Sequence, residues 1–302
     1  MKKLLTLSSQ NALLDEQTEI TRVIAQTNQL NLMIQFYTKV LRLNLIQQTD
    51  HQVLLGTSNK VLVELNEMSA LTSPNNYSSL YHFALLYPNE LELAKALKYL
   101  DEIGYNHSPT DHGYSKTSYL TDPDGNTIEL YIRTPDRSEY IQDGNTIYVK
   151  YQDGRIGNGR DPLDTDKLYA LIPNNSVIEK VVPNDLSIGH VHIYASDIHE
   201  SNDFYAKVLG FADGIMYEPF HMADVSLSLA KYHVIAFNEW KGNINKANQK
   251  LRAFSTIELK LNPIDLKPLL KRLDENKVAY KETDDHYIFQ DPSGIHINLL
   301  KK

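Results

Sequence analysis

The pattern of polar and apolar residues predicts a histidine-bearing strand in the second half of the chain. Over SIGHVHIYA (187–195) the pattern has a period of two, which is typical of a strand because its side chains point to alternate faces. His190 and His192 therefore share one face, and the opposite face is apolar. Asp197 then offers an N-cap to a short helix with an apolar stripe. The segment predicts a strand that presents two histidines, followed by a helix.

The same order of elements occurs four times along the chain. Each unit opens with a strand pattern, continues with a helix pattern and closes on short strand-like runs separated by turn residues. FYTKVLRL (36–43) corresponds to FYAKVLGF (204–211), and DPDGNTIEL (122–130) corresponds to DPSGIHINL (291–299). Self-similarity at a period of roughly 50 residues indicates an internal repeat. The four predicted units span residues 19–66, 79–131, 185–240 and 252–300.

The repeat predicts an α+β fold built from four βαβββ modules. Two modules form an N-terminal pair within 19–135, and two form a C-terminal pair within 185–302. Residues 136–184 between them are rich in Asp, Gly and Asn, and only TDKLYALI (165–172) has a helical pattern. We interpret 136–184 as a long connection between the two domains.

Composition and net charge exclude several kinds of binding partner and of metal site. Hydrophobic residues make up 42% of the 302 residues and charged residues 23%, which is typical of a soluble globular protein. The net charge of −8 argues against nucleic acid or an anionic membrane as a partner. The absence of cysteine excludes disulfides and thiolate metal sites. The opening MKKLLTLSSQ has too short an apolar run for a signal peptide, so we expect a cytoplasmic protein with a small-molecule substrate.

Five motifs carry a family resemblance: YHF (81–83), DHGYS (111–115), YLTDPDGNTIELY (119–131), GHVHI (189–193) and YHVIAFNEW (232–240). Taken together they resemble the vicinal oxygen chelate superfamily, which includes glyoxalase I, bleomycin-resistance proteins and extradiol ring-cleaving dioxygenases. The resemblance is strongest to its two-domain catechol 2,3-dioxygenase-like members. It implies that modules pair into two incompletely closed eight-stranded barrels, one of them around a metal ion.

The resemblance implies that His82, Glu129 and His190 bind the metal. A lone histidine such as His82 is more often a hydrogen-bonded core residue, but Glu129 in an apolar strand needs a buried partner. A metal ion is one such partner, and an arginine is the alternative. Two histidines and one carboxylate with open positions suit Fe(II), while Mn(II) or another divalent ion remains an alternative.

These ligands belong to different halves of the chain, within modules 79–131 and 185–240. The corresponding positions of the first and fourth modules hold Arg22, Ser255 and Asn298, so neither consecutive pair of modules has a complete set. We therefore expect modules two and three to pair around the metal, and modules one and four to form a metal-free companion. Modules two and three could supply the three ligands by pairing within one chain or between the subunits of a homo-oligomer.

Four further residues have roles implied by the resemblance. Tyr232 and Val234 stand where relatives have histidines, a departure that bears on substrate choice and activity. Because the chain has 19 tyrosines, a purely structural role is the alternative for Tyr119. The four are His233 as acid/base, Tyr119 and His112 as groups that hold the substrate, and His192 as pocket lining.

The resulting hypothesis is an Fe(II)-dependent extradiol dioxygenase that opens a catechol-type aromatic diol with O2, a reaction of aromatic compound degradation. One alternative is a glyoxalase-like isomerase or lyase, which usually adds a fourth protein ligand. No carboxylate lies in 232–238, which counts against it. The other alternative is a metal-free binding or resistance protein, for which the ligand set would be surplus.

Overall fold

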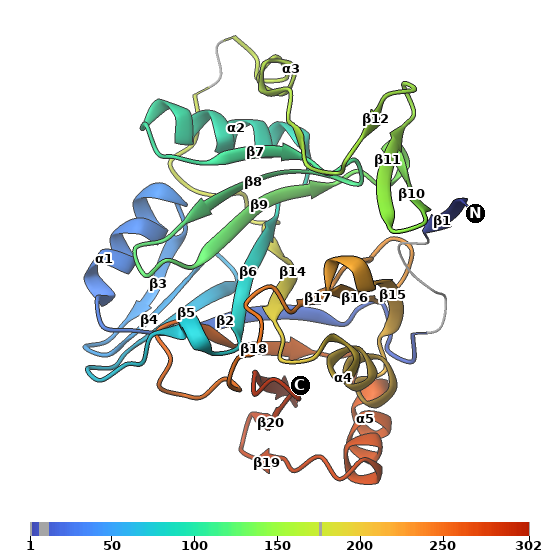
Figure 1. The fold of residues 1–302 in the computed structure, drawn as a ribbon. Coiled ribbons are helices and arrows are strands. Elements are labelled where there is room, and N and C mark those ends of the chain that lie inside the picture. Colours follow the sequence, from blue (N-terminus) through green and yellow to red (C-terminus); the bar gives the residue numbers. More distant parts are fainter. Residues whose placement is uncertain (1, 6–11, 175–176, 302) are drawn as a thin grey trace.

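The computed structural model describes residues 2–5, 12–174 and 177–301, and their strands form two large sheets and a small one (Figure 1). The nine-stranded sheet has the order β13 (Asp161–Pro162), β7 (Ser108–Asp111), β8 (Ser115–Thr121), β9 (Thr127–Arg133), β6 (Ser79–Leu86), β14 (Ser187–Tyr194), β17 (Ile235–Asn238), β16 (Met222–Ser226) and β15 (Ala212–Tyr217). The eight-stranded sheet has the order β19 (Lys281–Glu282), β20 (His286–Gln290), β21 (His296–Leu300), β18 (Phe254–Lys260), β2 (Glu19–Thr27), β5 (Val61–Glu67), β4 (Gln52–Gly56) and β3 (Asn44–Gln48).

Each large sheet is assembled from modules that are distant in the sequence. The central pair of the nine-stranded sheet is β6 with β14, and that of the eight-stranded sheet is β2 with β18; both pairs are antiparallel. Modules two and three therefore share the first sheet, and modules one and four share the second. The outermost strands of each sheet do not pair with each other among the described residues. The predicted α+β fold with two incompletely closed barrels is confirmed, with β13 as an additional strand.

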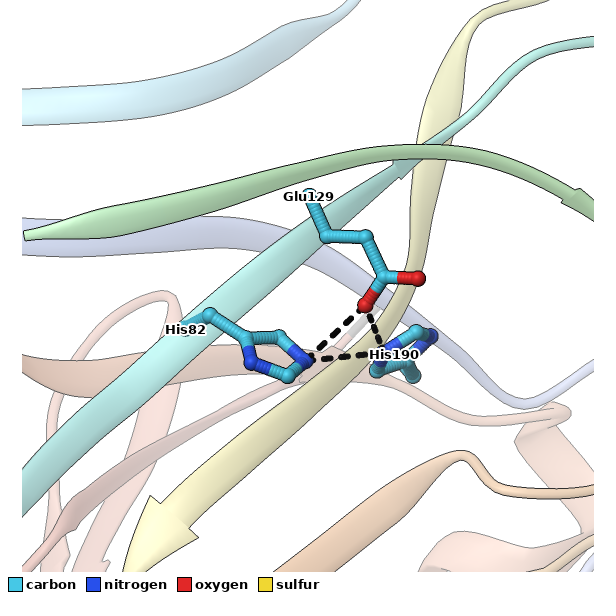
Figure 2. A group of neighbouring side chains, drawn as sticks. All are labelled: His82, Glu129 and His190. Carbon is cyan, nitrogen blue, oxygen red and sulfur yellow. Dashed lines mark hydrogen bonds and ion pairs between the residues drawn. The ribbon is translucent and has the colours of Figure 1, made fainter. Parts of the chain in front are cut away.

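The core lies between the two large sheets and also between the sheets and the helices, whose apolar faces are buried. Strand alternation sends Phe83 of β6 toward the other sheet, where its ring centre lies 4.9 Å from that of Phe254 on β18. His82 lies on the opposite face of β6 and points toward Glu129 and His190 (Figure 2). The helices are α1 (Leu30–Gln35), α2 (Glu90–Glu102), α3 (Thr165–Tyr169), α4 (Ile198–Asp203) and α5 (Pro263–Glu275). Short 3₁₀ segments are η2 (Pro74–Asn76), η3 (Pro135–Arg137) and η5 (Glu218–Phe220).

The repeated FYxKVL motif has a structural role that links consecutive modules. α1 and α4 each continue into a π-helical segment, η1 (Phe36–Val40) and η4 (Phe204–Leu209). From these, Tyr37 donates a hydrogen bond of 3.1 Å to Asp122, and Tyr205 donates one of 3.1 Å to Asp291. Both acceptors belong to the repeated DPxG turns of the next module. The two repeated motifs thus fasten module one to two and module three to four.

Residues 136–184, expected to be a connection, contain strands that we did not predict. β10 (Ser138–Asp143) and β11 (Thr146–Tyr151) form a hairpin, which builds the small sheet together with β1 (Lys2–Leu5) and β12 (Ile156–Gly157). A period of two was present in SEYIQDGNTIYVKY, and Gly144 has the positive φ of 59° that such a tight turn needs. The overall abundance of Asp, Gly and Asn hid this local signal.

No helix in the described part of the chain has the length and apolar character needed to cross a membrane. The interpretation of MKKLLTLSSQ rests partly on residues 1 and 6–10, which lie outside the described residues.

We expect Tyr205→Phe to lower the free energy of unfolding by about 1–3 kcal/mol, because it removes a hydrogen bond to a buried carboxyl group. Burial raises the pKa of Asp291 to about 7, and the bond from Tyr205 acts in the opposite direction. A carboxyl with a raised folded pKa contributes stability below its unfolded pKa, which is lost as the pH rises through about 7. Losing the tyrosine raises this pKa further, so the penalty should be larger at pH 8 than at pH 5.

Urea unfolding at both pH values would measure this effect. Tyr37→Phe should behave in the same way, because burial also raises the pKa of Asp122, to about 6. Tyr169→Phe is the matched control, since its partner Asp101 is exposed. Equal penalties in the buried and the exposed pair would contradict a fastening role.

Candidate metal centre

Three adjacent strands place His82, Glu129 and His190 around Ala84. On β6, Ala84 lies opposite Glu129 of the parallel strand β9 and opposite His190 of the antiparallel strand β14. His82 lies two residues before Ala84, on the same face of β6. Because the side chain of Ala84 ends at its Cβ atom, it leaves room for the three longer side chains. These side chains point toward one another (Figure 2).

The three converging atoms form an almost equilateral triangle. His82 Nε2 and His190 Nε2 are 3.1 Å apart, and each lies 3.1 Å from Glu129 Oε2. Three ligands at right angles around one ion, with this spacing, would each lie about 2.2 Å from it, which matches nitrogen and oxygen bonds to divalent metals. The residues are 4%, 2% and 4% exposed. The triad therefore fits a divalent cation bound on one face.

The protonation states also favour a cation. Burial alone would raise the pKa of Glu129, but the charges and hydrogen bonds of His190 and His82 hold it well below its usual range. Burial lowers the pKa of His190 to about 3, against the opposing effect of Glu129. A carboxylate thus faces a neutral imidazole, the states in which both groups bind metals. If both Nε2–H groups are donated to Glu129 Oε2, the contact between the two nitrogens is left unsatisfied, because neither nitrogen can then accept a hydrogen bond from the other.

Tyr131 packs beside the triad and explains the glycine of the GHVHI motif. Its ring centre lies 4.8 Å from that of His190. A Cβ atom at Gly189 would lie 2.0 Å from the Tyr131 hydroxyl oxygen, so a larger residue cannot occupy that position without moving this ring. Among the described residues, the Tyr131 hydroxyl and His82 Nδ1 are both buried without a hydrogen-bond partner.

His233 lies next to the triad and is oriented by a residue that the sequence analysis missed. Its ring centre is 4.9 Å from that of His190, and its Nδ1 lies 2.6 Å from Asp224 Oδ2. Asp224 is 3% exposed on β16, an apolar strand, so the reasoning applied to Glu129 could have identified it. With Nδ1–H donated to Asp224, Nε2 of His233 is the nitrogen available for proton transfer.

The two departures from the family's histidine run point away from this position. Tyr232 is 2% exposed and donates a hydrogen bond of 2.6 Å to the backbone oxygen of Tyr114. Val234 is 6% exposed and belongs to the hydrophobic core. Only His233 of these three residues lies against the triad, in a backbone conformation with φ of 53°.

Tyr119 and His112 form a connected pair on the other side of the triad. The Tyr119 ring centre lies 5.6 Å from that of His82, and its hydroxyl is 2.8 Å from His112 Nε2. His112 Nδ1 donates to the backbone oxygen of Gly159, so its Nε2 is an acceptor for the Tyr119 proton. Burial and the charge of Glu129 raise the pKa of Tyr119 well above its usual value, which keeps the phenol neutral. His112 thus reaches the site through Tyr119.

His192 contributes its ring to the site but directs its Nε2 elsewhere. The ring centre lies 5.2 Å from that of His82, and Nε2 accepts a 2.9 Å hydrogen bond from the Asn238 side chain. Burial and the neighbouring histidines, His82 first, lower the pKa of His192 well below its usual value. Tyr81 and Trp240, which we did not single out, contact the same ring at 5.3 and 5.5 Å.

The corresponding place in the second sheet holds a protein cation. Arg22 takes the position of His190, and its guanidinium nitrogens lie 2.7 Å from Glu64 and 3.0 Å from Glu258. The counterpart of His82 is Thr256 and not the expected Ser255, because Thr256 pairs with His296 as His82 pairs with Thr127.

Comparisons with known proteins find relatives among glyoxalases and dioxygenases. The family model "Glyoxalase/Bleomycin resistance protein/Dioxygenase superfamily" matches residues 19–130. A catechol-2,3-dioxygenase of Bacillus subtilis (strain 168) is 30% identical over 94% of this chain and 98% of that protein. Glyoxalase I from Zea mays has a similar fold, with a TM-score of 0.55 at 15% identity over 94% of this chain and 92% of the other. A solved Bacillus subtilis structure reaches a TM-score of 0.61 at 12% identity, covering 97% of this chain and 86% of that one.

We expect one divalent ion per chain to bind when the protein is loaded with Fe(II) or Mn(II) without oxygen. His82→Ala and Glu129→Ala should each weaken binding by more than about 100-fold, because each removes one of three ligands. Metal analysis after dialysis and the metal-dependent rise in melting temperature would measure this. His296→Ala, a half-buried histidine of the second sheet, should keep the full stoichiometry. Unchanged binding in His82→Ala would contradict the proposed site.

Proposed function

Because this chain belongs to the glyoxalase/bleomycin resistance protein/dioxygenase superfamily, we propose that it is a metal-dependent extradiol dioxygenase that opens the ring of a catechol-type diol with O2. The observation that carries the proposal is the buried triad of two histidines and one carboxylate on three adjacent strands. The 30% identity to a catechol-2,3-dioxygenase over nearly the full length of both chains supports the same reaction class. Fe(II) is the metal that best suits such a triad in oxygen chemistry.

The symmetry of the sheet favours this reaction over a glyoxalase-like isomerisation. His82 lies opposite His192, and Ala84 lies opposite His190. β6 and β14 are therefore related by a local twofold axis that exchanges His82 with His190 and Ala84 with His192. Glu129 pairs with Ala84, and Ala236 pairs with His192. The same axis therefore places Ala236 at the position equivalent to that of Glu129. Alanine cannot bind a metal, so the position where a fourth protein ligand would stand is left for substrate oxygens.

The surrounding side chains supply proton transfer and positioning. Bound to the triad, Fe(II) would provide open coordination positions at which the diol oxygens and O2 are brought together. His233 lies within reach as a base that accepts a proton from a substrate hydroxyl, and Asp224 stabilises the imidazolium that results. Tyr119 directs its own proton to His112, so its oxygen can accept a hydrogen bond from the second hydroxyl. His192 and Tyr81 line the approach with aromatic surface.

The overall reaction balances without a further reductant. The carbon–carbon bond beside the diol breaks, and both atoms of O2 are retained in the ring-opened product. The protein's task is therefore to bind, orient and move protons.

We expect the Fe(II)-loaded protein to consume one O2 per catechol and to form a coloured ring-opened product. An oxygen electrode and absorbance spectroscopy on the same sample would measure the ratio. The metal-depleted protein and Glu129→Ala are the controls, because neither should support turnover. Stoichiometric metal binding without oxygen consumption, across a panel of substituted catechols, would contradict the dioxygenase proposal and favour an isomerase.

We expect His233→Gln to reduce kcat by about 100-fold or more while KM changes little, because it removes proton transfer and not substrate binding. Asp224→Asn should reduce kcat less and change its pH dependence, since the imidazolium loses its carboxylate. Steady-state rates across pH would separate the two effects. Full activity in His233→Gln would exclude this histidine as the acid/base.

A further inference from the structure

Residues 136–184 span the open side of the metal-bearing sheet. β13 extends the edge at β7, and Tyr140 donates a 2.6 Å hydrogen bond to the backbone oxygen of His112 nearby. On the opposite edge, Tyr217 at the end of β15 donates a 2.7 Å hydrogen bond to the backbone oxygen of Asn145, in the β10–β11 hairpin. The segment between the modules thus contacts both edges that the incomplete barrel leaves apart (Figure 1).

Arg160 lies at this bridge and is held from both sides. The backbone oxygen of its neighbour Gly159 accepts the hydrogen bond from His112. Its guanidinium carbon lies 4.8 Å from the ring centre of Phe220 and 5.8 Å from that of Trp240. One side of the barrel therefore anchors the backbone, and the other side supports the guanidinium.

A continuous series of rings leads from Arg160 to the triad. Trp240 contacts Tyr81 and His192, each with ring centres 5.5 Å away. Tyr81 in turn lies 5.0 Å from His82. Exposure decreases along this path, from 38% at Trp240 to 4% at the ligand His82. At the exposed end Trp240 is joined by Phe220, which is 37% exposed and has its ring centre 5.1 Å away, so aromatic surface is grouped at the entrance to the buried site.

The guanidinium group has no anionic partner among the described residues, although the chain carries a net charge of −8. Nearby carboxylates are bound elsewhere. Asp161 accepts a 2.8 Å hydrogen bond from Tyr151, Glu239 binds the backbone N–H of Ile198 and the His221 ring, and Glu218 pairs with His199. Arg160 is therefore a positive charge on a rigid aromatic support, free to bind an anion from solution.

We propose that Arg160 recognises a carboxylate on the substrate, so that the natural substrate is a catechol bearing a carboxylate side chain. The inference rests on the proposed function of the triad, which would bind the diol end of the same molecule. A planar guanidinium forms two parallel hydrogen bonds with a carboxylate, which a neutral ester or methyl group cannot offer. The rings of Trp240 and Tyr81 would contact the aromatic body between the two ends.

Binding measured without oxygen tests this directly. Titration calorimetry on the Fe(II)-loaded protein would compare 3,4-dihydroxybenzoate and 3,4-dihydroxyphenylacetate with their methyl esters. For at least one acid, we expect the wild-type protein to bind it about tenfold more tightly than its ester. Arg160→Gln should bring this ratio close to one while leaving ester affinity unchanged, and Arg160→Lys should restore it in part.

Arg155→Gln is the matched control, because Arg155 lies in the same segment but pairs with Asp153. It should keep the wild-type ratio. An unchanged ratio in Arg160→Gln, an equal loss for acids and esters, or no preference for either acid in the wild type would overturn the proposal. Oxygen consumption with unsubstituted catechol separates the two hypotheses: turnover without acid preference refutes the role of Arg160 alone, whereas acid preference without turnover refutes the dioxygenase alone.

Discussion

The antiparallel pairing of β6 with β14 is the contact on which the candidate site depends. It joins strands from different halves of the chain and brings His82 and His190 to within 3.1 Å of each other. A shift of this register by one residue would turn one histidine out of the barrel, because strand side chains alternate between faces. The fold is held in this register by the fully buried faces of both strands, where Phe83 and Val191 pack into the core. The chemistry of the site is therefore set by core packing.

The two large sheets differ in the group that can neutralise their buried carboxylates. Each buries carboxylates within a half-barrel, and buried carboxylates require a positive partner. In the second sheet the positive charge belongs to a side chain of the protein, because Arg22 forms ion pairs with Glu64 and Glu258. In the first sheet the pKa of His190, which faces Glu129, is lowered to about 3, so this histidine does not supply the positive charge. The comparison indicates why one sheet suits a resident metal and the other a structural role.

Much of this arrangement follows from sequence, because repeated motifs mark equivalent positions. FYxKVL and DPxG aligned the four modules, and that alignment identified the modules that could contribute each of the three converging residues. Two kinds of feature were not accessible. The strand pairing that makes Thr256 the counterpart of His82 is a matter of backbone register, which sequence spacing does not report. Arg160 lies in an irregular segment, and its neighbours Phe220 and Trp240 come from another module, so no periodicity connects them.

The interleaving of modules also has a consequence for synthesis on the ribosome. β2 emerges early, but its partner β18 is separated from it by 237 residues at the Thr21–Glu258 contact. Until then β2 presents an unpaired edge, and non-local pairing of this kind slows folding. Neither half of the chain contains both strands of either central pair. The nascent protein must therefore protect sheet edges until the third and fourth modules have been made, which makes it a candidate client for chaperones.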